Sequence, residues 1–219
     1  MIWQSGDMVH ISGYGTVTVA ARTIWPGNSI IDLLSSTRLK VSISSDSADD
    51  AAGGTGATDI VVEYLDRSFK RQHEYLELAG TTPLYLEVSA LQHAEISNAG
   101  SGRTNAGTIY IGRGVVAGGV PATVHDQIEP GEGTTQTLKY TVPAGKTFEI
   151  QKIETNADIT VTDYTVQLCK TTAGTTQVLH QFQETSPGFI FEGGEIMTLR
   201  HKNATGAGTV YAHVTGKLI

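Results

Sequence analysis

The chain has 219 residues, of which 39% are hydrophobic and 17% charged, a composition typical of a globular protein and unlike that of a disordered or membrane-embedded one. Its 22 acidic and 15 basic side chains give a formal net charge of −7, which disfavours direct binding of nucleic acid because a polyanion is repelled. The single cysteine excludes an intrachain disulfide framework and a multi-thiolate metal site.

The first 38 residues show little alternation of apolar and polar side chains. They contain Gly13, Gly15, Pro26 and Gly27, which interrupt regular structure. We therefore expect residues 1–38 to form an irregular N-terminal arm or edge segment. The start of the chain has neither a basic stretch nor an apolar core of signal-peptide length, and apolar runs are short throughout. We expect no signal peptide and no transmembrane helix, and folding in a cytosol.

From residue 39 onward the sequence alternates with a period of two, which places one face of a strand on a core and the other in water. The first such run is Leu39, Val41 and Ile43, and others follow at 60–64, 76–78, 84–88, 138–142, 164–168 and 210–214. Glycine-containing turns separate them at 53–56, 79–82, 98–102, 143–146 and 192–194.

This pattern predicts an all-β protein, an antiparallel β-sandwich or jelly roll. The segments 30–34 and 89–93 have helical spacing but are too short to be stable helices alone.

The distribution of the expected strands indicates two modules. Residues 39–119 are expected to form a first β-sandwich, residues 120–136 a connection, and residues 137–219 a second sandwich or jelly roll. Distant strands often interleave in sandwiches, so a single merged sandwich over residues 39–219 is an open alternative.

No pattern typical of a reactive centre is present. The seven histidines include no His-x-His or His-x3-His pair, and there is no Gly-x-Ser-x-Gly motif. Cys169 has the parity of the polar residues of its run, so we expect it to be exposed or to face a second layer, with ordinary reactivity. We therefore predict no catalytic residue, no metal centre and no cofactor.

One acidic loop is a candidate for a bound ion. Asp46, Asp49 and Asp50 precede Gly53, and their carboxylates could hold Ca²⁺ together with backbone carbonyls. The loop lacks the alternating ligands and terminal glutamate of an EF-hand. A solvated turn with side-chain-to-backbone hydrogen bonds explains the same residues more simply.

Basic and aromatic side chains are the candidates for contacts between subunits, since arginine and tryptophan are enriched where interfaces concentrate their energy. Three of them lie in the N-terminal arm and three in an expected hairpin loop. These candidates are Arg22, Trp25, Arg38, Arg67, Lys70 and Arg71. The alternative is that each is an ordinary surface residue and that the hairpin loop is a solvated turn.

The run Ser44-Ser45-Asp46-Ser47-Ala48-Asp49-Asp50-Ala51-Ala52-Gly53-Gly54-Thr55-Gly56-Ala57, continued by 60–66, 105–109 and 140–147, resembles a group of virion structural proteins of tailed bacteriophages, especially short-tailed marine phages. The resemblance covers roughly residues 23–150. An extra glycine at Gly53-Gly54 departs from the group's pattern within a loop. The resemblance implies a particle component and not an enzyme.

We therefore expect a non-enzymatic virion structural protein that is assembled in the host cytoplasm. The favoured form is a homo-oligomer, a trimer being one option, that decorates the capsid exterior and binds the major capsid protein, without contacting nucleic acid or membrane. One alternative is a tail or fibre component that contacts the host. Another, of a different class, is a glycan-binding or glycan-cleaving sandwich in which Tyr85, Trp25 or an Asp/Glu pair lines a groove.

Overall fold

The computed structural model describes residues 2–5, 8–16, 22–23, 39–157, 165–172, 175–182, 185–186, 188–202 and 208–219. Over these ranges the regular structure consists of strands in antiparallel sheets, without an α-helix, so the prediction of an all-β antiparallel protein is confirmed. Within this part of the chain, no helix has the length and apolar character needed to cross a membrane. Of the two short segments with helical spacing, 89–93 lies in strand from residue 90 onward, and 30–34 lies outside the described residues.

The chain divides into two compact units. The first, here called the terminal unit, combines residues 1–26 with 136–219, and the second, the inserted unit, comprises residues 27–135. This division differs from the predicted one, because the N-terminal residues belong with the C-terminal ones and the expected connection 120–136 is partly strand.

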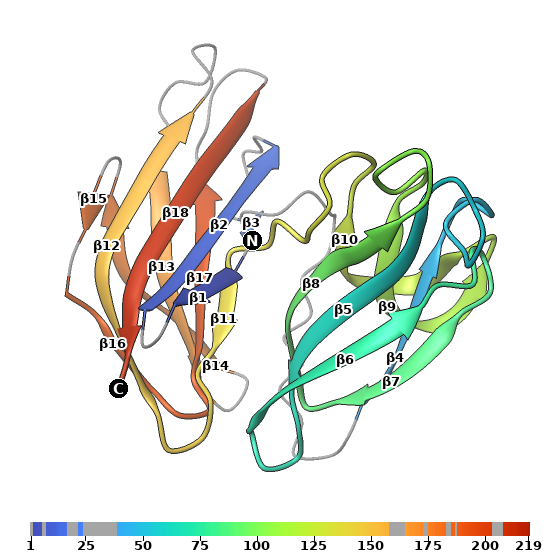
Figure 1. Cartoon of the computed structure of the whole chain (residues 1–219). Coiled ribbons are helices and arrows are strands. Elements are labelled where there is room, and N and C mark those ends of the chain that lie inside the picture. The colour runs from blue at the N-terminus through green and yellow to red at the C-terminus, as the bar shows by residue number, and fades with distance from the viewer. Residues whose placement is uncertain are drawn as a thin grey trace. The chain divides into compact units, whose positions relative to one another are not determined.

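The terminal unit contains a six-stranded and a five-stranded sheet (Figure 1). The first has the order β1-β2-β18-β12-β15, and β16 also pairs with β12. The second has the order β11-β17-β13-β14, and β3 also pairs with β17. The bounds in the first sheet are β1 Ile2–Ser5, β2 Met8–Thr16, β12 Thr147–Ala157, β15 Thr185–Ser186, β16 Ile190–Glu192 and β18 Thr209–Leu218. In the second sheet they are β3 Arg22–Thr23, β11 Lys139–Thr141, β13 Thr165–Thr172, β14 Thr175–Phe182 and β17 Ile196–Lys202.

Both sheets of the terminal unit contribute to one hydrophobic core. Val9 and Ile11 of β2 are almost fully buried and join side chains of β12 and β18 from their own sheet and of β13 and β17 from the other. At its centre, the rings of Tyr140 and Phe148 lie with their centroids 4.9 Å apart. The N-terminal strand β2 is therefore part of this core.

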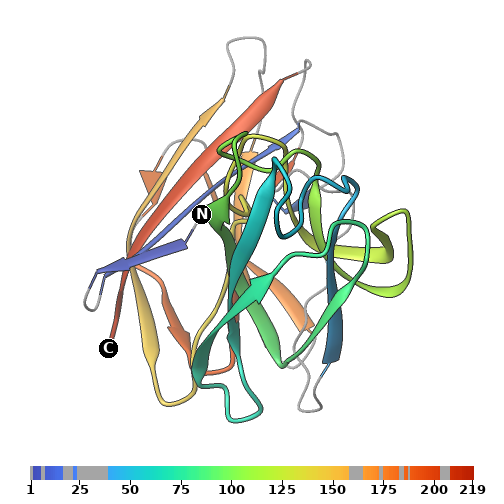
Figure 2. The same cartoon turned by 45° about the vertical axis from the view of Figure 1, so that its right-hand side comes forward.

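The inserted unit also has two sheets with a shared core (Figures 1 and 2). A four-stranded sheet has the order β10-β9-β4-β7 and a three-stranded sheet the order β6-β5-β8. The bounds are β4 Leu39–Ser45, β5 Ala57–Leu65, β6 Arg71–Glu77, β7 Leu84–Val88, β8 Ala90–Ala99, β9 Ile109–Ala117 and β10 Val120–Ile128.

Two segments expected to be irregular are strands. Residues 2–5 and 8–16 are not an arm, whereas the alternative of an edge segment holds for β1, which lies at the edge of its sheet. In β2, Gly13 interrupts the apolar alternation because its backbone approaches the carbonyl of Gln136 so closely that a Cβ would lie 2.0 Å from that oxygen. Residues 120–128 are β10 and not a connection. Two register shifts, after Pro121 and after Val124, break the alternation that would have revealed this strand.

Cys169 is fully buried, so the expectation of an exposed thiol is wrong and only the alternative of a covered position remains. A register shift between Leu168 and Cys169 disturbs the alternation on which the expectation rested. Burial raises the pKa of the thiol, and the charge of Arg200 opposes this only in part. The thiol is therefore even less reactive than an ordinary one.

Candidate functional site

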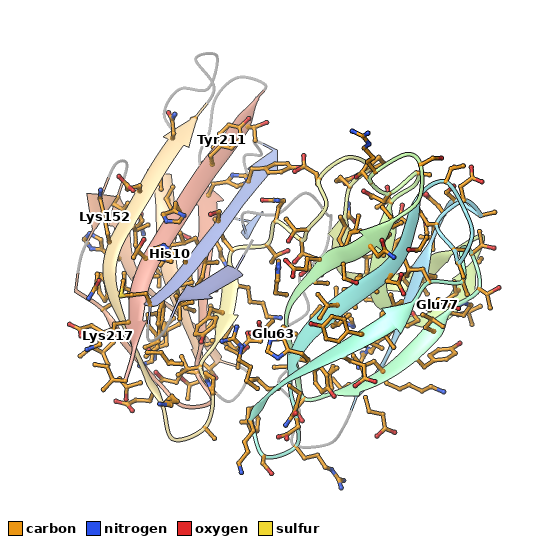
Figure 3. The ribbon with its side chains drawn as sticks, in the orientation of Figure 1. His10, Glu63, Glu77, Lys152, Tyr211 and Lys217 are labelled. Carbon is orange, nitrogen blue, oxygen red and sulfur yellow. The ribbon has the colours of Figure 1, made fainter. Side chains whose placement is uncertain are left out.

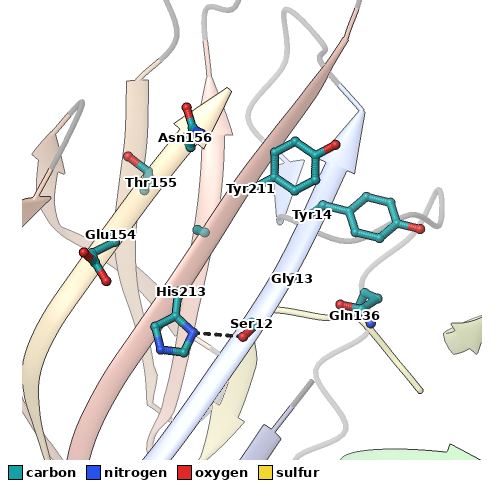
Figure 4. A pocket seen from close by; sticks show the side chains of 10 residues that line it. Ser12, Gly13, Tyr14, Gln136, Glu154, Thr155, Asn156, Tyr211 and His213 are labelled. Carbon is teal, nitrogen blue, oxygen red and sulfur yellow. Dashed lines mark hydrogen bonds between the residues drawn. The ribbon is translucent and has the colours of Figure 1, made fainter. Parts of the chain in front are cut away.

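The candidate site lies on the six-stranded sheet of the terminal unit, where β12, β18 and β2 pair side by side. Asn156 lies opposite Tyr211, which in turn lies opposite Tyr14. Since neighbouring strands are about 4.8 Å apart, the three side chains form a row roughly 10 Å long. The two tyrosine rings have centroids 6.1 Å apart and are tilted by 46° (Figure 4). Tyr211, labelled in Figure 3, is 46% exposed.

A second row runs parallel to the first, two residues along each strand. Glu154 lies opposite His213, which lies opposite Ser12. Ser12 Oγ is 2.8 Å from His213 Nδ1, and Thr215 Oγ1 is 3.1 Å from His213 Nε2. Thr215 Oγ1 also lies 3.4 Å from Nδ1 of His10. The His213 ring is thus held by hydroxyl groups at both nitrogens, which fixes its orientation on the sheet.

The electrostatic environment favours a neutral His213. Partial burial lowers the pKa of the imidazole, and the neighbouring His10, whose ring centroid is 5.7 Å away, lowers it further. Glu154 acts in the opposite direction. Its own carboxylate pairs with Lys152 Nζ at 2.6 Å, and the hydrogen bond from Lys152 is the main cause of the lowered pKa of Glu154.

The two rows line a pocket of about 530 Å³ (Figure 4). The remaining lining residues are Gly13, Gln136, Thr155 and Ala212. The absence of a side chain at Gly13 is what allows the backbone of Gln136 to lie against β2, since a Cβ there would be 2.0 Å from the Gln136 carbonyl oxygen. The pocket therefore presents two aromatic rings beside carboxylate, amide, imidazole and hydroxyl groups.

The order Glu154, His213, Ser12 has the composition of a hydrolase triad, but the bonding differs. In a triad the acid orients the imidazole through one ring nitrogen while the other contacts the nucleophile. Here the ring nitrogen that is not bonded to Ser12 meets the hydroxyl of Thr215, and the carboxylate of Glu154 pairs with Lys152. This geometry supports ligand binding and does not support activation of Ser12.

A pH dependence of stability follows from His213. Because its pKa in the folded chain is lower than the ordinary value of 6.5, the unfolded chain binds more protons at mildly acidic pH. We expect the melting temperature of the terminal unit to fall as pH decreases from about 7.5 to 5.5. In His213→Gln this dependence should be shallower, and calorimetric scans across that range measure it. If the melting temperature of the variant depended on pH as steeply as that of the wild type, the assignment of this effect to His213 would be contradicted.

In the acidic loop considered for an ion, Asp50 is engaged in hydrogen bonds within the chain. Asp50 is fully buried, and its Oδ1 accepts hydrogen bonds from the backbone N–H of Ala57 at 2.8 Å and Ala106 at 2.7 Å. Its Oδ2 accepts from Ser45 Oγ at 2.6 Å and from the backbone N–H of Gly107 at 2.9 Å. The carboxylate thus joins the loop after β4, the start of β5 and the loop before β9.

The other two aspartates do not complete an ion site with Asp50. Asp46 accepts hydrogen bonds from the backbone N–H of Thr108 at 2.8 Å and from the hydroxyl of Tyr110 at 3.2 Å, and Asp49 is exposed. Within the described ranges, no three acidic, histidine or cysteine side chains are grouped to hold a metal. The geometry favours a loop that is held in place by hydrogen bonds from its carboxylates to the backbone. Because Asp50 is buried, this turn is less solvated than the sequence predicted.

The expected basic hairpin loop lies between β5 and β6. Asp66 closes it by accepting backbone hydrogen bonds from Ser68 at 2.8 Å and Lys70 at 3.1 Å. The bond from Lys70 is the main cause of the lowered pKa of Asp66. Arg67 and Lys70 are exposed, as contacts with a partner require.

Arg71 does not belong to this loop. It begins β6 and forms a salt bridge with the buried carboxylate of Glu63, to which its Nη2 donates at 2.5 Å. Its guanidinium is therefore engaged within the sheet, which disfavours it as a contact for a partner.

The other predicted contact residues can be placed only in part. Arg22 lies in β3, opposite His201 of β17, and its side chain is not described. Trp25 and Arg38 lie outside the described residues. Tyr85, named as a candidate for a glycan groove, is 53% exposed, and Lys40 Nζ lies 4.1 Å from its ring centroid.

The residues of the pocket were not among the sequence candidates. Ser12 and Tyr14 lie in the segment expected to be irregular, although His10, Ser12 and Tyr14 do alternate with Val9 and Ile11. This short alternation of polar and apolar residues was the signal from which strand β2 could have been predicted.

No protein-family model matches the chain, and no curated protein matches it.

Proposed function

We propose that the chain is a non-enzymatic structural protein of a tailed-phage virion, built from two antiparallel β-sandwich or jelly-roll units. The observation that carries the proposal is the environment of Asp50. This residue lies in the most specific part of the resemblance, the run 44–57, and its carboxylate fastens three segments of the inserted unit to each other. The hydrogen bonds of Asp50 thus hold loops of the inserted unit together, which supports a structural function for the resembling residues.

The sandwich assignment is supported by the two cores. In each unit, side chains from two different sheets pack into one hydrophobic cluster. Two packed sheets with a common core are the defining feature of a sandwich. Such a unit needs no cofactor for its stability and provides broad surfaces for contacts.

We propose that these surfaces contact the major capsid protein on the head exterior and further copies of this chain. The four-stranded sheet of the inserted unit has β10 and β7 as its edge strands, and edge strands can pair with a neighbouring chain. Val115, 80% exposed in β9, and Val120, 37% exposed in β10, add apolar surface near one of these edges. The net charge of −7 favours a place away from packaged DNA.

Antibody labelling of intact particles in negative stain tests the proposal. We expect label distributed over the head of the phage that encodes the chain. Label at the tail or portal vertex alone would reject capsid decoration and support the alternative of a tail or fibre component. Particles that carry no label would reject a virion function altogether.

A further inference from the structure

We infer that the pocket on β12, β18 and β2 of the terminal unit binds a neutral saccharide of one or two sugar rings. The inference rests on this pocket alone and not on the proposed virion function. It also differs in place from the glycan groove considered at Tyr85, where Lys40 lies over the ring.

The aromatic row provides the apolar part of such a site. A pyranose ring has a face made of C–H groups, which packs against an aromatic ring, whereas its hydroxyls point outward. Tyr211 is 46% exposed beside Tyr14, and the 46° tilt between the rings gives two differently oriented aromatic surfaces. Exposed aromatic area bordered by polar groups is typical of binding sites, and each aromatic contact contributes beyond its buried area.

The polar groups around the rings match the outward hydroxyls of a sugar. Asn156 extends the aromatic row, and Glu154 and His213 form the parallel row about 7 Å along the strands. Gln136 lines the pocket from a different segment. Amide and carboxylate groups together offer both donors and acceptors, which paired hydroxyls need.

The charges of the pocket favour a neutral ligand. Among the described residues that line it, none is a lysine or arginine, and Glu154 carries the formal negative charge. Lys152, a nearby cation, is engaged with that carboxylate at 2.6 Å. A phosphate or sulfate would therefore meet no basic side chain among the described lining residues, and the Glu154–Lys152 pair adds no net positive charge.

His213 contributes a neutral polar surface at physiological pH. With its pKa lowered by burial and by His10, the imidazole adds no positive charge for an anionic ligand. Its ring is fixed by Ser12 and Thr215, so the polar row changes little when a ligand binds. Because this side chain is already held in one orientation, less conformational entropy is lost when a ligand binds.

The size of the pocket agrees with the proposed ligand. A volume of about 530 Å³ falls within the range of small-molecule pockets, and the two rows cover an area roughly 10 by 7 Å. This area accommodates one or two sugar rings lying flat on the sheet.

Saturation-transfer NMR on the full chain tests this inference. The probes are glucose, galactose, mannose, N-acetylglucosamine, maltose, cellobiose, lactose and chitobiose, with glucose 6-phosphate as the anionic comparison. We expect transfer to at least one neutral sugar, about tenfold weaker affinity in Tyr211→Ala, and unchanged affinity in Tyr75→Ala. Tyr75 is a matched control because it is a 74% exposed tyrosine in the inserted unit.

Backbone chemical shifts of the wild-type chain give a second readout that does not depend on any variant folding. Shift changes caused by the bound sugar should concentrate at residues 12–14, 154–156 and 211–213. Asn156→Ala should weaken binding with little effect on the melting temperature, because this side chain is exposed and its Oδ1 accepts a hydrogen bond from the adjacent backbone N–H of Ala157 at 2.9 Å. The inference is overturned if no neutral sugar of the panel binds, if shift changes fall elsewhere, or if glucose 6-phosphate binds better than glucose.

Discussion

Replacing Asp50 by asparagine is expected to destabilise the inserted unit by about 2–6 kcal/mol. Both carboxylate oxygens accept backbone hydrogen bonds. Oδ1 accepts them from the N–H groups of Ala57 and Ala106, and Oδ2 accepts one from the N–H group of Gly107. Whichever way the amide of asparagine turns, its NH₂ group faces at least one of these donors. Because the site is fully buried, the N–H groups that lose their acceptor cannot form hydrogen bonds with water instead.

Urea denaturation of wild type and variant, followed by a probe in the inserted unit, measures this effect. Asp49→Asn is the matched control, since Asp49 lies in the same loop but is exposed. We expect it to change the free energy of unfolding by less than about 0.5 kcal/mol. Equal effects of the two substitutions would contradict the hydrogen-bonded function of Asp50.

The calcium hypothesis can be tested in the same experiment. If the loop is held by hydrogen bonds alone, EDTA should leave the unfolding curve of the wild type unchanged. A stabilising effect of added Ca²⁺ that disappears in Asp50→Asn would instead show that these carboxylates hold the ion.

Deleting residues 1–16 is expected to prevent the terminal unit from folding while leaving the inserted unit intact. The deletion removes β1 and β2, and β2 pairs with β18 over the whole range from Met8 to Thr16. It also removes Val9 and Ile11 from the core, each contributing about 1.5–3 kcal/mol by burial. Together with the lost hydrogen bonds of the ladder, this approaches the entire stability of a typical domain.

Amide hydrogen exchange of the truncated chain, compared with the full chain, separates the two units. We expect β12, β13, β17 and β18 to lose protection and β4, β5 and β9 to keep it. A chain of residues 27–135 alone should show the same protection in those three strands. Retained protection of β18 in the truncated chain would contradict the assignment of residues 1–16 to the terminal unit.

The strand content was predictable because most strands follow a period of two. Leu39, Val41 and Ile43 in β4, or Val210 and Val214 in β18, alternate as the pleat requires. The strands that sequence reasoning missed are those where this period fails locally. Glycine at a close backbone contact interrupts β2, and register shifts near a proline interrupt β10.

The candidate site could not be predicted because it depends on register between distant segments. Ser12 and His213 are 201 positions apart, yet their side chains lie 2.8 Å from each other. No local pattern specifies which strand pairs with β18. Similarly, the acidic loop was visible in the sequence, but only the fold reveals that Asp50 is the buried carboxylate and Asp49 the exposed one.

Electron cryo-microscopy of purified intact particles tests the central claim, that the chain is an architectural component of a virion. We expect density on the head exterior, in repeated copies, into which the terminal and inserted units can each be fitted as antiparallel β-sandwiches. Particles whose surface density is fully explained by other chains, with this protein found only in the infected-cell lysate, would contradict it.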